Sequence, residues 1–128
     1  MQNAKEQVRV ADVCHLLEQW APPALQENYD NSGLLAGDAQ MAVTGVLVSL
    51  DLTEAVIDEA IARGCNLIIS HHPIIFGKLK RLVGADYVQR ALIKAIKHDV
   101  ALYAIHTNLD NIRQGVSARM AEVLGLQN

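Results

Sequence analysis

The sequence has little of what several protein classes require. Aromatic residues make up 4% of its 128 residues, which is too few for a surface that stacks nucleic-acid bases. The net charge of −3 and the pI near 5.9 give no basic surface, so we expect no dedicated nucleic-acid interface. No run approaches the roughly 18 apolar residues that a membrane-spanning helix needs, so we expect no membrane span.

Cysteines are equally scarce. Only Cys14 and Cys65 are present, and two cysteines in a chain of this length do not form a disulfide framework. We interpret both as reduced, structural thiols of a cytoplasmic protein. Residues 1–9 are polar and charged, without the apolar segment of a secretory signal.

What the sequence does contain is apolar residues, at 51%, which excludes intrinsic disorder. Three nearly continuous apolar runs are typical of strands: 43–50, 66–70 and 100–105. Four segments have the periodicity of amphipathic helices: 11–20, 54–63, 85–99 and 114–124. This alternation predicts one α/β domain over residues 1–128, with a mostly parallel sheet and helices on both faces.

Local signals add detail to this prediction. The run 43–50 is typical of a strand buried on both faces. Thr53 is placed to cap the helix that follows it, and Gly64 to end that helix. Residues 28–33 are rich in turn-forming residues and predict a loop. We interpret Trp20, at the end of the first predicted helix, as a core residue.

Histidines follow two of the predicted strands. His71 and His72 come directly after the second, and His106 comes directly after the third, with Asp110 close behind. Ligands of open parallel sheets bind beyond the carboxyl ends of the strands, so we expect these side chains at one edge. Imidazole and carboxylate groups are ligands for divalent ions such as zinc, iron and manganese. The sequence therefore predicts a metal site.

Adjacent histidines restrict how that site is built. In an extended chain the side chains of His71 and His72 point to opposite sides, and Pro73 favours extended geometry at His72. The pair therefore serves two ions, or one ion and a supporting hydrogen bond. Two alternatives need no metal: a histidine acid or base oriented by Asp110, or plain polar loop residues.

Other polar residues admit two interpretations each. Three cations after the histidine pair either attract an anionic substrate or form a solvated cluster: Lys78, Lys80 and Arg81. Three turn-forming residues are either a rim of the site or ordinary turns: Asp30, Asn31 and Asp38. Asp51 also follows a strand, and we interpret it as the start of the Thr53 cap region.

Three motifs occur in order along nearly the whole chain: YDNSGLLAGD at 29–38, SHHP at 70–73 and YAIHTNLD at 103–110. They resemble the Ngg-one-interacting-factor-three-like family, whose members are often named GTP cyclohydrolase I type 2 homologues. The resemblance implies an α/β protein with a centre of two divalent ions, commonly a ring-shaped homo-hexamer. It also implies a metal-dependent hydrolase of a small molecule, for which a nucleotide or phosphoester is our expectation.

The resemblance also suggests roles for single residues. His71 and His72 match the family's paired histidine ligands, and Asp110 matches its aspartate ligand. His106 matches a position beside the centre, where we expect a catalytic role as proton shuttle or in orienting the substrate. Family members are longer than this chain, and their second half supplies a further His and Glu.

The chain accordingly resembles the N-terminal half of a dinuclear-metal protein. After Asp110 it has no histidine, and Glu122 is its one acidic residue there. We expect an incomplete centre and an exposed face that favours self-association. The main hypothesis is a metal-dependent hydrolase. The alternatives are a non-catalytic metal-binding regulatory or interaction protein, and an inert half-protein.

Overall fold

The protein is described by a computed structural model over residues 6–127, and its centre is a mixed four-stranded sheet. The strands lie in the order β1-β4-β3-β2, and their bounds are Gly33–Ala36 (β1), Val46–Ser49 (β2), Leu67–Ser70 (β3) and Ala101–Ala104 (β4). β2, β3 and β4 are parallel, and β1 runs antiparallel to β4. The predicted α/β fold with a mostly parallel sheet is confirmed.

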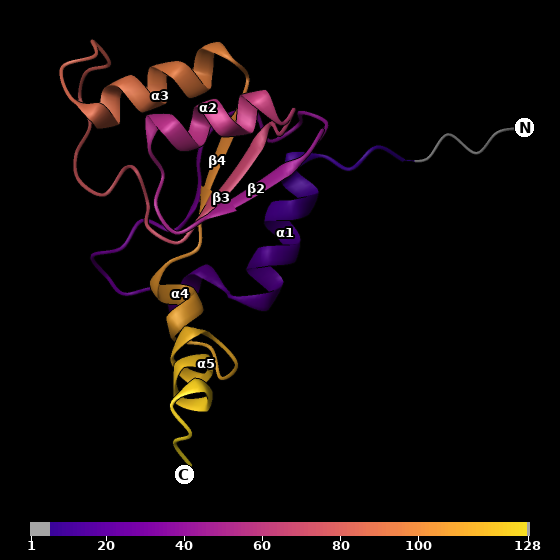
Figure 1. The fold of residues 1–128 in the computed structure, drawn as a ribbon, viewed down its shortest axis with the longest axis vertical. Coiled ribbons are helices and arrows are strands. Elements are labelled where there is room, and N and C mark those ends of the chain that lie inside the picture. The colour runs from indigo at the N-terminus through magenta and orange to yellow at the C-terminus, as the bar shows by residue number, and fades with distance from the viewer. Residues whose placement is uncertain (1–5, 128) are drawn as a thin grey trace, which may run out of the picture.

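Helices cover both faces of the sheet, as predicted. Their bounds are Val10–Trp20 (α1), Glu54–Ala62 (α2), Tyr87–Lys97 (α3), Thr107–Asp110 (α4) and Val116–Val123 (α5), with a short 3₁₀ turn at Pro23–Leu25. Figure 1 shows α2 and α3 side by side on one face, α1 on the other, and α5 projecting below the sheet. Among the described residues, no helix is long and apolar enough to cross a membrane.

Two apolar layers hold the sheet between these helices. On the α2–α3 side, Ile68 and Leu102 pack in one buried cluster with Ile57. On the α1 side, Leu67 and Tyr103 pack in a second buried cluster that includes residues of α1. Neighbours in a strand point to opposite faces, so both layers draw on β3 and β4. This two-sided burial accounts for the continuous apolar runs at 66–70 and 100–105.

The helix ends follow their sequence signals. The Thr53 hydroxyl accepts a hydrogen bond of 3.2 Å from the Val56 N–H at the start of α2. Gly64, with φ of +71°, follows the last residues of α2 in the left-handed conformation that ends helices. Both predictions are therefore confirmed.

Two predictions of burial are wrong. β2 is an edge strand, and Val46 and Val48 are 41% and 74% exposed because α1 packs nearer β1 and β4 than β2. Trp20 is not a core residue but 53% exposed, because it lies at the end of α1, whose buried residues are Val10 and Cys14.

Besides the 3₁₀ turn at Pro23–Leu25, two elements have no counterpart in the sequence prediction. β1 is a four-residue strand whose pairing partner, β4, is far along the chain. α4 is a single helical turn that begins directly after His106. Both are too short for a periodic pattern, so tertiary contacts decide them.

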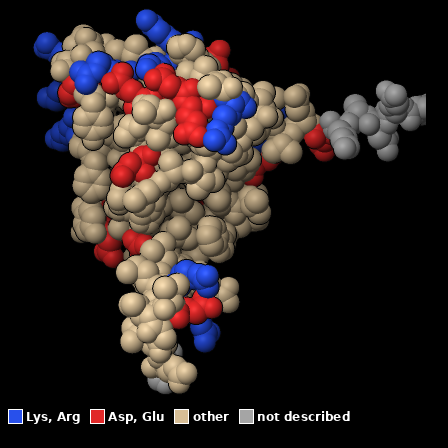
Figure 2. Space-filling view, viewed as in Figure 1, with Lys and Arg blue, Asp and Glu red and all other residues tan. Residues whose placement is uncertain are grey.

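The outer surface of α2 and α3 carries interleaved charges of both signs, as Figure 2 shows at its upper edge. Arg90 lies 3.3 Å from a carboxylate oxygen of Glu54, and Lys94 lies 2.9 Å from one of Asp58. Exposed pairs of this kind each contribute about 0.2–1 kcal/mol. They join the two helices, whereas the apolar layer beneath supplies most of the stability.

Gly37 provides a test of the close approach between the end of β1 and β4. Its φ is +107°, and an added Cβ would lie 2.7 Å from Ala101 Cα; Gly33 has a similar φ of +115° but open space. We expect Gly33→Ala to lower the free energy of unfolding by about 1–3 kcal/mol through backbone strain. Gly37→Ala should lose a further ~1–3 kcal/mol through overlap. Urea denaturation measures both, and equal losses would contradict the close approach.

Candidate metal centre

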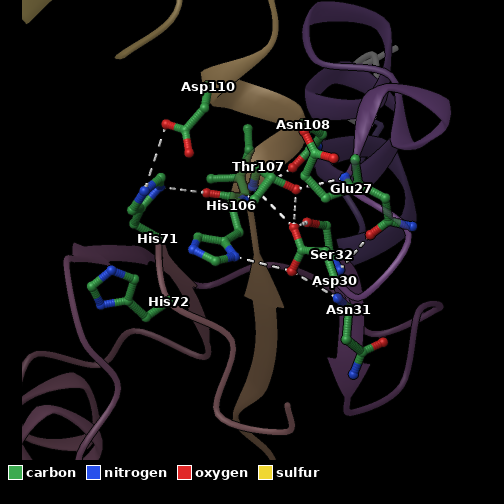
Figure 3. Close-up of polar contacts among 12 residues, drawn as sticks. Glu27, Asp30, Asn31, Ser32, His71, His72, His106, Thr107, Asn108 and Asp110 are labelled. Carbon is green, nitrogen blue, oxygen red and sulfur yellow. Dashed lines mark hydrogen bonds and ion pairs between the residues drawn. The ribbon is translucent and has the colours of Figure 1, made fainter. Parts of the chain in front are cut away.

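Three histidines converge at the carboxyl ends of the parallel strands, where the sequence predicted them. His71 and His72 follow β3, and His106 lies between β4 and α4. One ring nitrogen of each lies within 4.8 Å of a nitrogen of both others. The ring centroids are 5.1–5.5 Å apart, and Figure 3 shows the rings around a common space.

Hydrogen bonds hold two of these rings in one orientation. His71 Nδ1 lies 2.8 Å from the Ile105 carbonyl oxygen, and His106 Nδ1 lies 3.0 Å from Asp30 Oδ1. Carbonyl and carboxylate oxygens only accept hydrogen bonds, so Nδ1 is the donor in both rings. In the neutral imidazole this leaves the Nε2 lone pair free. Metal-binding histidines are commonly held in this way.

The third ring is held by a residue that sequence reasoning missed. His72 Nδ1 donates to Asp51 Oδ1 at 2.6 Å, so Asp51 does more than begin the cap region of α2. The two residues are half or more exposed, in contrast to His71 and His106. A signal was present, because Asp51 follows a parallel strand just as His71 does.

Asp110 approaches the cluster from the His71 side. Its Oδ1 lies 3.8 Å from His71 Nε2, which is too long for a hydrogen bond. Two ligand atoms that each lie about 2.0–2.2 Å from one ion can be separated by this distance. Both side chains are partly exposed, at 21% and 32%, so an ion can reach them from solvent.

Asp30 is a fully buried carboxylate that fastens His106 in place. It accepts hydrogen bonds from the Thr107 N–H at 3.0 Å, the Ser32 hydroxyl at 3.2 Å and the Asn31 N–H at 2.7 Å, as well as from the Thr107 hydroxyl. Burial acts to raise the pKa of Asp30, but the hydrogen bonds from Thr107 and His106 outweigh it and hold the pKa well below its ordinary value. Asp30 is therefore ionised at neutral pH.

The two interpretations of the turn residues are now separated. Asp30 and Asn31 border the cluster, whereas the Asp38 carboxylate accepts a bond from the Gln40 N–H in its own exposed turn. Thr107 was not considered from the sequence, because 77 residues separate it from Asp30. Only the fold brings the two together.

Replacing Asp30 tests this buried anchor. Asp30→Asn should lower the free energy of unfolding by about 2–3 kcal/mol at neutral pH, because an amide cannot accept all these hydrogen bonds. A lowered pKa in the folded state stabilises it above the ordinary pKa, and this stabilisation is lost on acidification. The difference between the two proteins should therefore narrow as pH falls from about 5 to about 3.

The matched control is Asp38→Asn, which alters an exposed turn and should cost less than about 1 kcal/mol. Urea denaturation at several pH values gives both results. Equal losses in the two variants, or a difference that does not change with pH, would contradict the role of Asp30.

The chain is similar to bacterial proteins named GTP cyclohydrolase 1 type 2 homolog. It is 39% identical to the one from Clostridium acetobutylicum over 118 residues, which are 92% of this chain and 44% of that protein. It is 46% identical to the one from Halalkalibacterium halodurans over 116 residues, 91% of this chain and 31% of that protein. The chain thus spans less than half the length of these relatives.

Solved structures show the same fold over most of this chain. The Staphylococcus aureus protein SA1388 is 45% identical with a TM-score of 0.88, covering 94% of this chain and 39% of that one. A Bacillus cereus protein related to NIF3 is 42% identical with a TM-score of 0.89, covering 95% and 34%. HcgD from Methanocaldococcus jannaschii is 28% identical with a TM-score of 0.87, covering 95% and 49%.

The similarity therefore extends from single motifs to the whole fold. The sequence model of the family described as Duf34/NIF3 (NGG1p interacting factor 3) matches residues 8–128. That range contains every residue of the histidine cluster and the buried carboxylate that holds it. This chain belongs to the Duf34/NIF3 family.

Proposed function

We propose that this chain supplies His71, His72 and Asp110 as ligands to a centre of divalent metal ions in a hydrolase. The observation that carries the proposal is the shared orientation of the histidines. In all three rings of the cluster Nδ1 faces an oxygen acceptor, which leaves Nε2 of His71 and His72 for an ion and Nε2 of His106 for a substrate or proton. Three histidines serving only as polar loop residues need no such common orientation.

The donor set fits a divalent ion. Imidazole nitrogens together with a carboxylate suit zinc, iron or manganese. The number of ions is proposed from the family resemblance, which implies two. Ring nitrogens of His71 and His72 lie within 4.8 Å of each other, so this pair serves two ions or shares one. The chain spans under half of its relatives, so we propose that the remaining ligands come from a segment outside residues 1–128.

His106 is proposed as the residue that moves protons or orients the substrate. A pair of divalent ions supplies Lewis acidity and a nucleophile at neutral pH. His106 is 19% exposed, and the buried Asp30 fixes its tautomer, so Nε2 is free to accept a proton. A carboxylate that orients a histidine in this way is a recurrent arrangement in acid–base catalysis.

The proposed substrate is a small anionic molecule such as a nucleotide or phosphoester. Lys78, Lys80 and Arg81 are exposed in the segment between β3 and α3, and they form no ion pair within residues 6–127. Unpaired cations on the loop that follows the histidine pair attract anions to this end of the sheet.

We also propose a cytoplasmic homo-oligomer, in line with the hexameric ring that the family resemblance implies. Cys14 and Cys65 are free thiols, as a reducing compartment requires. Val48 on the edge strand is 74% exposed, and Val123 and Leu124 at the end of α5 are 72% and 69% exposed. Exposed apolar side chains on an edge strand and a projecting helix favour association.

Elemental analysis of the purified chain by plasma mass spectrometry tests the metal centre. We expect near-stoichiometric metal in the unaltered chain and little metal in His71→Ala and Asp110→Ala, because loss of a ligand lowers the affinity by at least about tenfold. His98→Ala is the matched control, because that exposed histidine lies after α3, outside the cluster. Equal losses in all three variants would refute the site. A folded chain without metal would show that binding requires the ligands proposed to lie outside residues 1–128.

Hydrolysis separates an enzyme from a metal-binding regulatory protein. With metal bound, we expect turnover of nucleotides or simple phosphodiesters, and a kcat lower by about 10²–10⁴ in His106→Ala through loss of proton transfer. Metal content measured in the same variant shows whether His106 acts as a ligand instead. The same assay on a full-length protein that contains the remaining ligands completes the test. If that protein binds stoichiometric metal but hydrolyses no substrate, the regulatory function is favoured.

A further inference from the structure

Two exposed aromatic rings lie beside the histidine cluster. Phe76 is 52% exposed, and its ring centroid is 6.3 Å from that of His106 with the planes at 78°. Tyr29 is 61% exposed, and its centroid is 6.3 Å from that of Phe76 at 60°. Because about half of the surface of each residue remains exposed, neither neighbour covers the other completely. The metal ligands and the proton-moving residue of the proposed function make no use of this pair.

The pair is held by the same loop that holds His106. Asn31 Nδ2 donates a 2.7 Å hydrogen bond to the Ile75 carbonyl oxygen, which joins the segment before Phe76 to the segment after Tyr29. Asp30, between Tyr29 and Asn31, fastens this loop to His106. Three consecutive residues thus have three tasks. Tyr29 supplies an aromatic ring, Asp30 supplies the buried carboxylate, and Asn31 connects the two loops. Rings held in place lose little conformational entropy when a ligand binds.

We infer that Phe76 supplies a stacking face, with Tyr29 edge-on beside it, for a planar heteroaromatic ring of the substrate. This inference rests on the proposed function, because it gives the substrate class of the same site. Aromatic faces bind flat π-systems by stacking with little regard to their substituents. A ring on Phe76 lies next to His106, since 6.3 Å separates the two centroids.

An aromatic pair at a surface also fits a contact with another protein. The position of this pair favours the small-molecule ligand. The pair adjoins the histidine cluster and is tied to it through Asp30 and Asn31, whereas the apolar side chains of the β2 edge and α5 belong to other elements. A protein contact at this pair would make Phe76→Ala change the sedimentation of the chain and not its affinity for a small molecule.

The test compares guanosine 5′-monophosphate with ribose 5-phosphate. Both contain the sugar and the phosphate, but only the first carries a planar guanine base. Isothermal titration calorimetry on the full chain, with divalent metal and again with chelator, gives both affinities. We expect the nucleotide to bind at least about tenfold more tightly, which is a typical worth of one stacked base. Phe76→Ala should weaken the nucleotide about 5- to 100-fold and leave ribose 5-phosphate unchanged, and Phe76→Trp should retain the preference.

Val83→Ala is the matched control, because Val83 is an exposed apolar residue of the same β3–α3 segment. Equal affinity for the two ligands, including no binding of either, would overturn the inference. So would a Phe76→Ala chain that keeps the preference, or one that changes only its sedimentation, which would indicate a protein contact. A ring preference that persists in chelator supports the inference even if the metal centre of the proposed function fails.

Discussion

The buried carboxylate of Asp30 is the interaction on which the rest of the site depends. It is fully buried and accepts hydrogen bonds from Thr107, Ser32, the Asn31 backbone and His106. A buried charge is stable only when such partners compensate it, so the loop after the first helix and the turn after β4 must come together. Once they do, the His106 tautomer is fixed and the aromatic pair is set beside it.

The register of the parallel strands brings the histidines to one edge of the sheet. β3 and β4 are in register over Leu67↔Ala101 to Ser70↔Ala104, so the residues that follow each strand reach the same edge. The Ile105 carbonyl, just beyond β4, then orients His71, just beyond β3. Backbone geometry and a side-chain hydrogen bond therefore act together to free the Nε2 atoms of neighbouring histidines. Strand register therefore places His71 beside His106, and the Asp30 loop fixes the orientation of His106.

This chain matches only part of each longer Duf34/NIF3 relative, and part of its own apolar surface is exposed. The chain spans 31% and 44% of two curated relatives, and it presents an uncovered face on β2 and an uncovered α5. The core between α2, α3 and the sheet is nevertheless well buried, as is the layer beneath α1. Residues 6–127 thus have their own core, while β2 and α5 carry exposed apolar side chains.

The sequence by itself determined the central βαβαβ unit and the positions of His71, His72, His106 and Asp110 along it. Continuous apolar runs and cap residues are local signals, and each acts over a few residues. Only the tertiary structure decided that β1 pairs with β4, that β2 is an exposed edge, and that Asp30 and Asp51 hold histidines. These features depend on contacts between segments far apart in the chain, and no local pattern encodes which distant partner a buried carboxylate or a short strand will find.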